Sequence, residues 1–227
     1  MKEAMLLNDE NYLSPNRLMS LLGSICFMFG TNICFLLAAL PLTLYIILFK
    51  TIDLRILSLL WIFCGPAVTA LFLAINKLLD KQDTGVLKTF FTSYLENFKQ
   101  SILISGVQGL LLFVLYLDMK FFMAKKMFIL YYMFMIISIL VILISFYIYP
   151  LLSKFKISSI NLIKLSILYS VKKFHILIIS LILFLLTTYI STQTPTIYIF
   201  FGPCITCYFI LMTEKKAFLE IKQVFFK

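Results

Sequence analysis

Between Met127 and Leu152 the chain reads MFILYYMFMIISILVILISFYIYPLL, a run without a single charged side chain. A helix that crosses a lipid bilayer needs about 20 consecutive apolar residues. A soluble fold of this size cannot hide such a run, because most of its residues lie near the surface. We therefore predict a membrane-spanning helix here, and the rest of the chain repeats the pattern.

The composition of the whole chain supports the same conclusion. Of its 227 residues, 62% are hydrophobic and 13% are charged. Soluble domains have about 45–50% apolar and about 25% charged residues. The excess of apolar side chains requires lipid as a second apolar solvent, and the low charge content excludes a disordered chain. We predict an all-α, polytopic helical bundle that forms a single membrane domain over residues 1–227.

The apolar runs divide the chain into about six expected spans. They lie at approximately residues 19–49, 56–79, 101–117, 127–152, 176–191 and 196–213. The first run is long for one span, so we expect it to tilt or to bend near Gly30 or Pro41. A five-span arrangement, in which part of the first run is re-entrant, is the alternative.

Lys and Arg residues are distributed unevenly among the segments that flank these spans. With six spans, one side of the membrane carries 15 of them and the other side carries five. Cytoplasmic segments of membrane proteins are enriched in Lys and Arg, so both termini are predicted to be cytoplasmic. The formal charge of +10 could also suggest nucleic-acid binding. Because the basic residues lie in short segments between apolar runs, we expect them to meet lipid headgroups instead.

Two of the expected cytoplasmic segments have the pattern of amphipathic helices, at approximately residues 86–100 and 157–174. Apolar side chains recur there at helical spacing. Such a helix either lies on the inner leaflet of the membrane or docks into a groove of a protein partner. The candidate partner-binding residues of the first helix are Phe90, Phe91, Tyr94, Asn97, Phe98 and Lys99.

A short internal repeat links the second and sixth expected spans. Residues 61–72 and 198–209 are identical at six of twelve aligned positions, and each copy contains Gly-Pro followed by Thr. Proline frees the carbonyl one turn earlier and bends the helix, Thr can bond the backbone, and Gly permits close helix contact. The repeat predicts either a packing device or two bent helices that line a path. The candidate bend, packing or path residues are Asn32, Pro41, Gly65, Pro66, Thr69, Gly202, Pro203 and Thr206.

The sequence contains no recognisable pattern of catalytic residues. The only histidine, His175, follows two lysines at the expected start of a span, and neither a phosphate-binding glycine-rich loop nor an HExxH motif occurs. All five cysteines fall inside apolar runs, which favours packing over disulfides or a metal site. No expected span carries Asp, Glu, Arg or His at its middle, which disfavours ion-coupled transport. We expect no enzyme activity, no cofactor, and no catalytic or metal site.

Three elements of the sequence resemble those of a known family. Residues 89–101, TFFTSYLENFKQS, resemble the F-[FW]-x-x-[FY]-x-x-N-F-K-Q motif of the YesL-like family of small bacterial membrane proteins. Residues 65–71, GPAVTAL, are similar to its G-P-A-x-x-A-L element, and Asn32 with Pro41 resembles its N…L-P element. In that family L-P runs almost directly into G-P-A. Here about two dozen residues separate Pro41 from Gly65, so either one span has become two or the Pro41 match is accidental.

The resemblance implies a domain of unknown function that is often associated with carbohydrate ABC importers. On this basis we expect a non-enzymatic accessory or regulatory subunit of a bacterial carbohydrate uptake system in the cell membrane. Its partners would be the lipid bilayer, ABC permease or ATPase subunits and a second copy of the chain, with no nucleic acid. The alternatives are a small-molecule permease or exporter whose path the two Gly-Pro helices line, and a membrane sensor or assembly factor.

Overall fold

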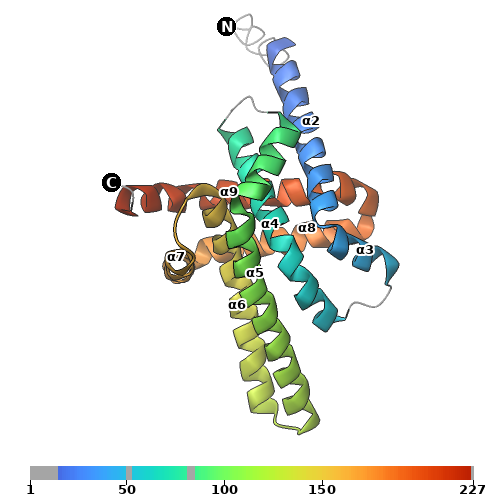
Figure 1. Ribbon diagram of the computed structural model, residues 1–227, viewed down its shortest axis with the longest axis vertical. Coiled ribbons are helices and arrows are strands. Elements are labelled where there is room, and N and C mark those ends of the chain that lie inside the picture. Colours follow the sequence, from blue (N-terminus) through green and yellow to red (C-terminus); the bar gives the residue numbers. More distant parts are fainter. Residues whose placement is uncertain (1–14, 50–52, 81–84, 226–227) are drawn as a thin grey trace, which may run out of the picture.

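The computed structural model describes residues 15–49, 53–80 and 85–225, and every regular element within them is a helix (Figure 1). The all-α prediction is confirmed. The helices are α2 (Pro15–Ala38), α3 (Leu40–Leu48), α4 (Leu54–Leu79), α5 (Val86–Ala124), α6 (Phe128–Lys154), α7 (Ser159–Lys172), α8 (Phe174–Gln193) and α9 (Pro195–Phe225).

Three of these helices, α4, α5 and α6, are each long and apolar enough to cross a membrane. Two bent pairs meet the same requirement jointly: α2 with α3, bent by 84°, and α7 with α8, bent by 94°. If each pair is one broken span, the described residues contain five spans, so the expected six is an approximate count. These are the helices of a membrane protein.

The bend expected in the first apolar run lies between α2 and α3, at Ala39. Pro41 stands in the first turn of α3 and has no N–H to donate to the preceding turn, which explains why the helix breaks here. Gly30 lies within α2, and the helix continues through it. The second helix of the region, α4, begins only at Leu54, so two separate helices carry Pro41 and Gly65.

Asp53 determines where α4 begins. Its carboxylate accepts a hydrogen bond from the backbone N–H of Arg55 at 2.9 Å and one from the Arg55 guanidinium at 2.6 Å. An acceptor at this position satisfies an N–H group that the first turn of a helix leaves without a partner. The side-chain and backbone hydrogen bonds from Arg55 lower the pKa of Asp53 to about 2.

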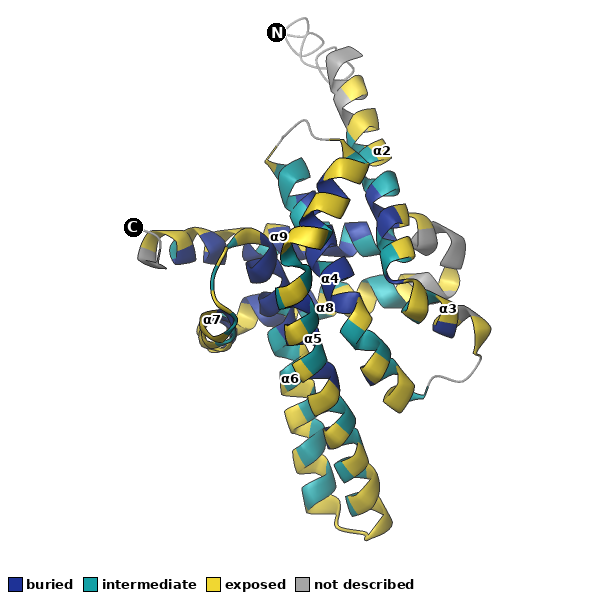
Figure 2. Ribbon diagram, viewed as in Figure 1, coloured by how far each residue is buried: buried dark blue, intermediate teal, exposed yellow. Residues whose placement is uncertain are grey.

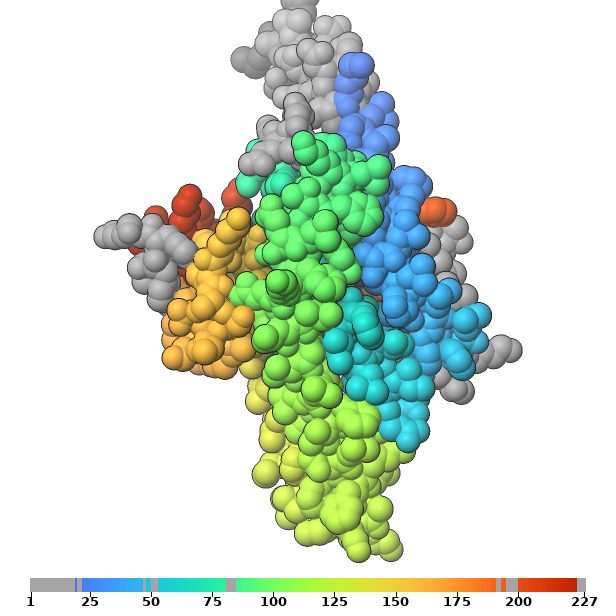
Figure 3. Space-filling view, in the orientation of Figure 1, coloured from blue at the N-terminus to red at the C-terminus, as the bar shows by residue number. Residues whose placement is uncertain are grey.

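Helix α5 differs from the expected arrangement. We expected an amphipathic helix at 86–100 and a separate span at 101–117, but one helix runs from Val86 to Ala124. Neither Gly nor Pro occurs between Val86 and Ser105, so nothing in the sequence interrupts the backbone hydrogen bonds there. The α5–α6 hairpin projects beyond the other helices (Figures 1 and 3). Helices α8 and α9 lie side by side and cross its direction (Figure 1).

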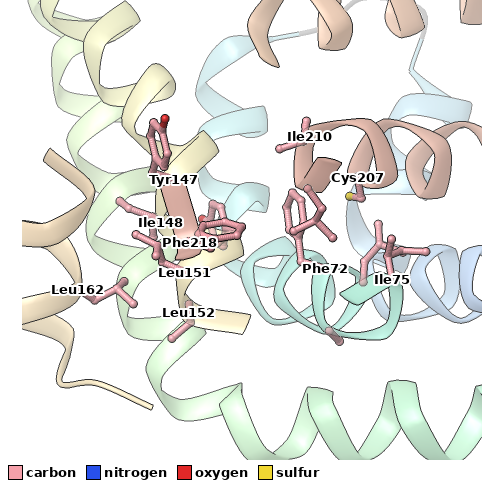
Figure 4. Close-up of a cluster of buried hydrophobic side chains, with 14 of the residues drawn as sticks. Phe72, Ile75, Tyr147, Ile148, Leu151, Leu152, Leu162, Cys207, Ile210 and Phe218 are labelled. Atoms are coloured by element: carbon pink, nitrogen blue, oxygen red, sulfur yellow. The ribbon is translucent and has the colours of Figure 1, made fainter. Parts of the chain in front are cut away.

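The core lies where α4, α6, α7 and α9 meet (Figure 2). Its largest fully buried side chains include Leu71, Tyr147, Leu151, Leu162 and Phe218, and several of them are drawn in Figure 4. The projecting end of the α5–α6 hairpin is largely exposed and apolar, as expected of a surface that faces lipid.

Candidate functional site

The closest helix contact that involves the sequence-predicted residues joins α4 to α5. Gly65 lies so close to α5 that a Cβ atom there would clash with Ser105 Oγ and lie 3.0 Å from the Ser101 carbonyl oxygen. On the other helix, a Cβ atom on Gly109 would lie 2.5 Å from the carbonyl oxygen of Ser58. The two glycines therefore let the backbones of α4 and α5 approach each other. We call this contact the α4–α5 seam.

Side-chain hydrogen bonds connect α4 and α5 along the seam, and one of them reaches the backbone carbonyl that Pro66 leaves without a partner. Ser105 Oγ donates to the Ile62 carbonyl at 2.7 Å, which is the carbonyl that an amide at position 66 would have bonded. Thr69 Oγ1 donates to the Gly65 carbonyl at 2.9 Å and accepts a hydrogen bond from Ser101 Oγ at 3.0 Å. Gly65, Pro66 and Thr69 are all buried. In this structure they are packing residues of the seam.

Ser105→Ala should lower the free energy of unfolding by about 1–2 kcal/mol, because the buried Ile62 carbonyl would lose its donor. In a Pro66→Ala background the backbone N–H of residue 66 can bond Ile62, so Ser105→Ala should cost about 0.5–1 kcal/mol less there. Unfolding of all four forms in mixed detergent micelles measures this coupling. Equal costs in both backgrounds would contradict the hydrogen-bond assignment.

The second copy of the repeat, in α9, makes a related set of contacts. Thr206 Oγ1 is 2.8 Å from the Gly202 carbonyl oxygen and 3.1 Å from Thr187 Oγ1 of α8. Thr206 therefore contacts α8 as Thr69 contacts α5. Pro203, half-buried, lies within α9 without ending it. The α4 and α9 helices meet through apolar side chains, among them Phe72 of the first copy and Cys207 of the second (Figure 4).

The other two bend candidates, Asn32 and Pro41, lie in different surroundings. Asn32 is fully buried in α2, whereas Pro41 is exposed at the start of α3. Pro41 is therefore not part of the buried contacts that Gly65, Pro66 and Thr69 make.

A polar cluster that sequence reasoning missed joins α4, α5 and α6. Tyr149 OH donates to Gln108 Oε1 at 3.0 Å and accepts from Trp61 Nε1 at 3.1 Å. Gln108 Nε2 in turn donates to Ser145 Oγ. The available sequence signal was Gln108 itself, an amide within an apolar run, which needs hydrogen-bond partners from other helices.

The candidate partner-binding residues of α5 do not share one environment. Phe90 is fully buried, Tyr94, Asn97 and Phe98 are half-buried, and Phe91 and Lys99 are exposed. Burial of Phe90 follows from the close contact of this part of α5 with α2 and α4, in which Val86 lies against Gly30. Phe90 therefore supports the fold and does not contribute to a docking surface.

An exposed apolar stripe remains on the outer side of the same segment. Leu87, Phe91 and Leu95 are 65%, 44% and 72% exposed, and their spacing of four residues places them on one helical face. We call these three residues the 87/91/95 stripe. It differs from the predicted face because α2 and α4 cover the neighbouring residues.

Two polar residues of the N-F-K-Q motif make hydrogen bonds within the chain. Asn97 Nδ2 donates to the Ser93 carbonyl at 3.1 Å. Gln100 Nε2 donates to the carbonyl of Ile157 at 2.8 Å, which ties α5 to the segment that precedes α7. These contacts provide a structural reason for an amide at both positions.

Glu214 is a second residue that sequence reasoning missed. It lies in α9, just after the expected sixth span, and it is fully buried. Neither carboxyl oxygen has a hydrogen-bond partner among the described residues, and Tyr147 and Cys207 lie close enough to interact with it electrostatically. The overlooked sequence signal was its helical spacing from Cys207, Ile210 and Phe218, which puts it on the same face as these apolar residues. The adjacent lysines pointed instead to a solvated tail.

Glu220 shows the contrasting environment on the same helix. Lys173 Nζ donates to Glu220 Oε1 at 2.6 Å, and this hydrogen bond lowers the pKa of the Glu220 carboxyl. In the described part of the chain, no cation pairs with Glu214. Because an ionised carboxylate that is buried without a partner costs several kcal/mol, we expect Glu214 to hold its proton.

The family comparison covers α2 to α5, including both glycines of the seam. Residues 27–119 match the family model described as "Protein of unknown function, DUF624". This part of the chain is a DUF624 segment. The expected resemblance to the YesL-like proteins is thereby confirmed.

A curated relative extends the similarity beyond the DUF624 segment. The chain is 28% identical over 179 residues to the "Uncharacterized protein YteU" of Bacillus subtilis (strain 168), an alignment that covers 73% of this chain and 81% of that protein. No solved structure matches the chain. The similarity therefore indicates a family relationship and does not assign a function.

Proposed function

We propose that this chain is a non-enzymatic accessory or regulatory subunit of a membrane transport assembly, and that it docks its partner through the 87/91/95 stripe. The observation that carries the proposal is an apolar stripe exposed on a helix whose opposite face is packed into the protein. Apolar residues four positions apart on one face are the usual anchors of a helix that binds in a groove.

The length of α5 indicates why a protein partner, and not lipid, would cover the stripe. A helix of 39 residues is about 58 Å long at 1.5 Å per residue, against about 30 Å for the hydrocarbon core of a bilayer. Part of α5 must therefore lie outside the hydrocarbon. The end with Lys88, Glu96 and Lys99 is the polar end, and these exposed side chains border the stripe.

The sequence supports an orientation and a class of partner. With the six spans expected from the sequence, the excess of Lys and Arg on one side supports cytoplasmic termini in a bacterial cell membrane and would put the polar end of α5 in the cytoplasm. The resemblance to the YesL-like family supports a carbohydrate ABC importer as the assembly, with its permease or ATPase subunit as the partner. The close packing at Gly65 and the Thr206–Thr187 contact support packing over a path, so we do not propose a permease.

Affinity co-purification in mild detergent tests the proposal. The wild-type chain should retain permease or ATPase subunits, and the variant L87Q/F91Q/L95Q should lose most of them because its stripe is polar. The matched control is I160Q/I167Q/V171Q, which changes three exposed apolar residues of α7 in the same way. Equal recovery with both variants, or sugar uptake unchanged on deletion of the chain, would refute the proposal.

A further inference from the structure

The end of α6 and the last turns of α9 border an open cleft lined by lysines. Its lining residues are Lys154, Phe155, Lys156 and Lys222, and its volume is about 360 Å³. The cleft is separate from the α4–α5 seam and from the 87/91/95 stripe, and neither the family resemblance nor the proposed docking uses it.

Aromatic packing holds the cleft together. Phe218 is buried in α9, and the Lys154 ammonium lies 5.1 Å from the centroid of its ring. The Phe155 ring packs edge-on against the same ring, with a centroid distance of 6.4 Å. Lys222 follows Phe218 by one helical turn and so lies on the same side of α9. Packing against Phe218 thus positions Lys154 and Phe155 near Lys222, while Lys156 lies in the segment between α6 and α7.

The charge in this cleft is only partly offset by the described residues. Lys215 and Lys222 lie close enough to Lys154 to repel it, and Asp80 is the acidic residue that attracts it. Among the described residues, no carboxylate lies within ion-pair distance of the lysines that line the cleft. Lys172 and Lys173, by contrast, share Glu220. Asp80 therefore offsets part of the charge on Lys154, and the remaining ammonium groups favour an anion.

The position of the cleft along α6 indicates which anion. Lys154 is the last residue of α6, immediately after its apolar run, so its ammonium lies at the level where hydrocarbon gives way to headgroups. We propose that this lysine cleft binds the phosphate of an anionic phospholipid of the inner leaflet. Phe155, half-buried beside the lysines, would contact the first methylene groups of that lipid.

Binding of phosphatidylglycerol to the purified full-length chain in detergent, followed by native mass spectrometry, tests this proposal. Each lysine near an anionic headgroup should contribute about fivefold in affinity. The wild type should therefore prefer phosphatidylglycerol to phosphatidylcholine by at least about tenfold, and K154Q/K156Q/K222Q should bind it about 100-fold more weakly. Should the triple variant not fold, K222Q alone, at an exposed position, should weaken binding about fivefold.

The control is K88Q/K99Q/K164Q, which removes the same charge from exposed lysines outside the cleft. It should change the affinity less than about fivefold. Equal losses in both triple variants would show diffuse attraction and refute a specific site. Displacement of the lipid by inorganic phosphate at equal concentration would also refute it, because the ligand would then be free phosphate.

Discussion

Replacing Gly65 with alanine is expected to lower the free energy of unfolding by about 2–3 kcal/mol, although the change adds only one methyl group. The new Cβ would clash with Ser105 Oγ and would also lie 2.5 Å from Ser105 Cβ. Ser105 cannot turn away without losing its hydrogen bond to the Ile62 carbonyl. Helix α5 must therefore move away from α4. Unfolding of the purified chain in mixed micelles measures the loss.

Two further glycine variants show whether this loss arises from the seam. Gly23→Ala, in α2, should be neutral or slightly stabilising, because nothing lies within 4 Å of its new Cβ and alanine favours the helix. Gly109→Ala should resemble Gly65→Ala, because the Ser58 carbonyl oxygen would lie 2.5 Å from its new Cβ. Combined, Gly65→Ala and Gly109→Ala should cost less than their sum, since one helix movement relieves both clashes. A full sum, or a neutral Gly65→Ala, would contradict this packing.

The second large effect is expected at Glu214. Glu214→Lys should cost about 3–5 kcal/mol or prevent folding, because it places an ammonium without a partner in a fully buried position. Glu214→Gln should be close to neutral, because it exchanges one uncharged polar group for another of the same shape. Glu214→Met should stabilise the chain by about 1 kcal/mol or more, because it removes a buried polar group that has no hydrogen bond.

The control for this series is Glu220→Gln, which removes a carboxylate that is paired with Lys173 at the surface of the same helix. Its effect should be a small loss, opposite in sign to that of Glu214→Met. If Glu214→Met destabilises the chain, Glu214 has a partner and the expected protonated state is wrong. If it stabilises the chain but abolishes partner recovery, the carboxyl is retained for function at a cost in stability.

The sequence predicted the class of fold because that conclusion depends on local properties. The run from Met127 to Leu152 and its counterparts satisfy the length and polarity that a bilayer demands, whatever their neighbours. The break near Pro41 was predictable for the same reason, since proline acts on its own helix. The role of Pro66 was half predictable: the freed Ile62 carbonyl follows from the sequence, whereas its donor, Ser105, lies on another helix.

The docking face could not be predicted from periodicity, and for Glu214 periodicity and the adjacent lysines pointed in opposite directions. A helical pattern shows that Phe90, Phe91, Tyr94 and Leu95 lie toward one side, but not which of them another helix covers. The tertiary structure buries Phe90 and leaves Phe91 and Leu95 outside. Glu214 is likewise a tail residue by its neighbours in sequence and a core residue by its neighbours in space.

The sequence by itself determined that this chain is a helical membrane protein with Gly-Pro helices and a resemblance to one bacterial family. Only the tertiary structure decided that α5 is one continuous helix with its inner face covered, that Gly65 and Gly109 bring α4 and α5 together, and that three lysines from α6, α9 and the segment after α6 share a cleft. The reason is physical. Hydropathy and helix propensity act within a few turns of the chain, whereas burial, hydrogen-bond partners and clustered charge depend on residues far apart in sequence.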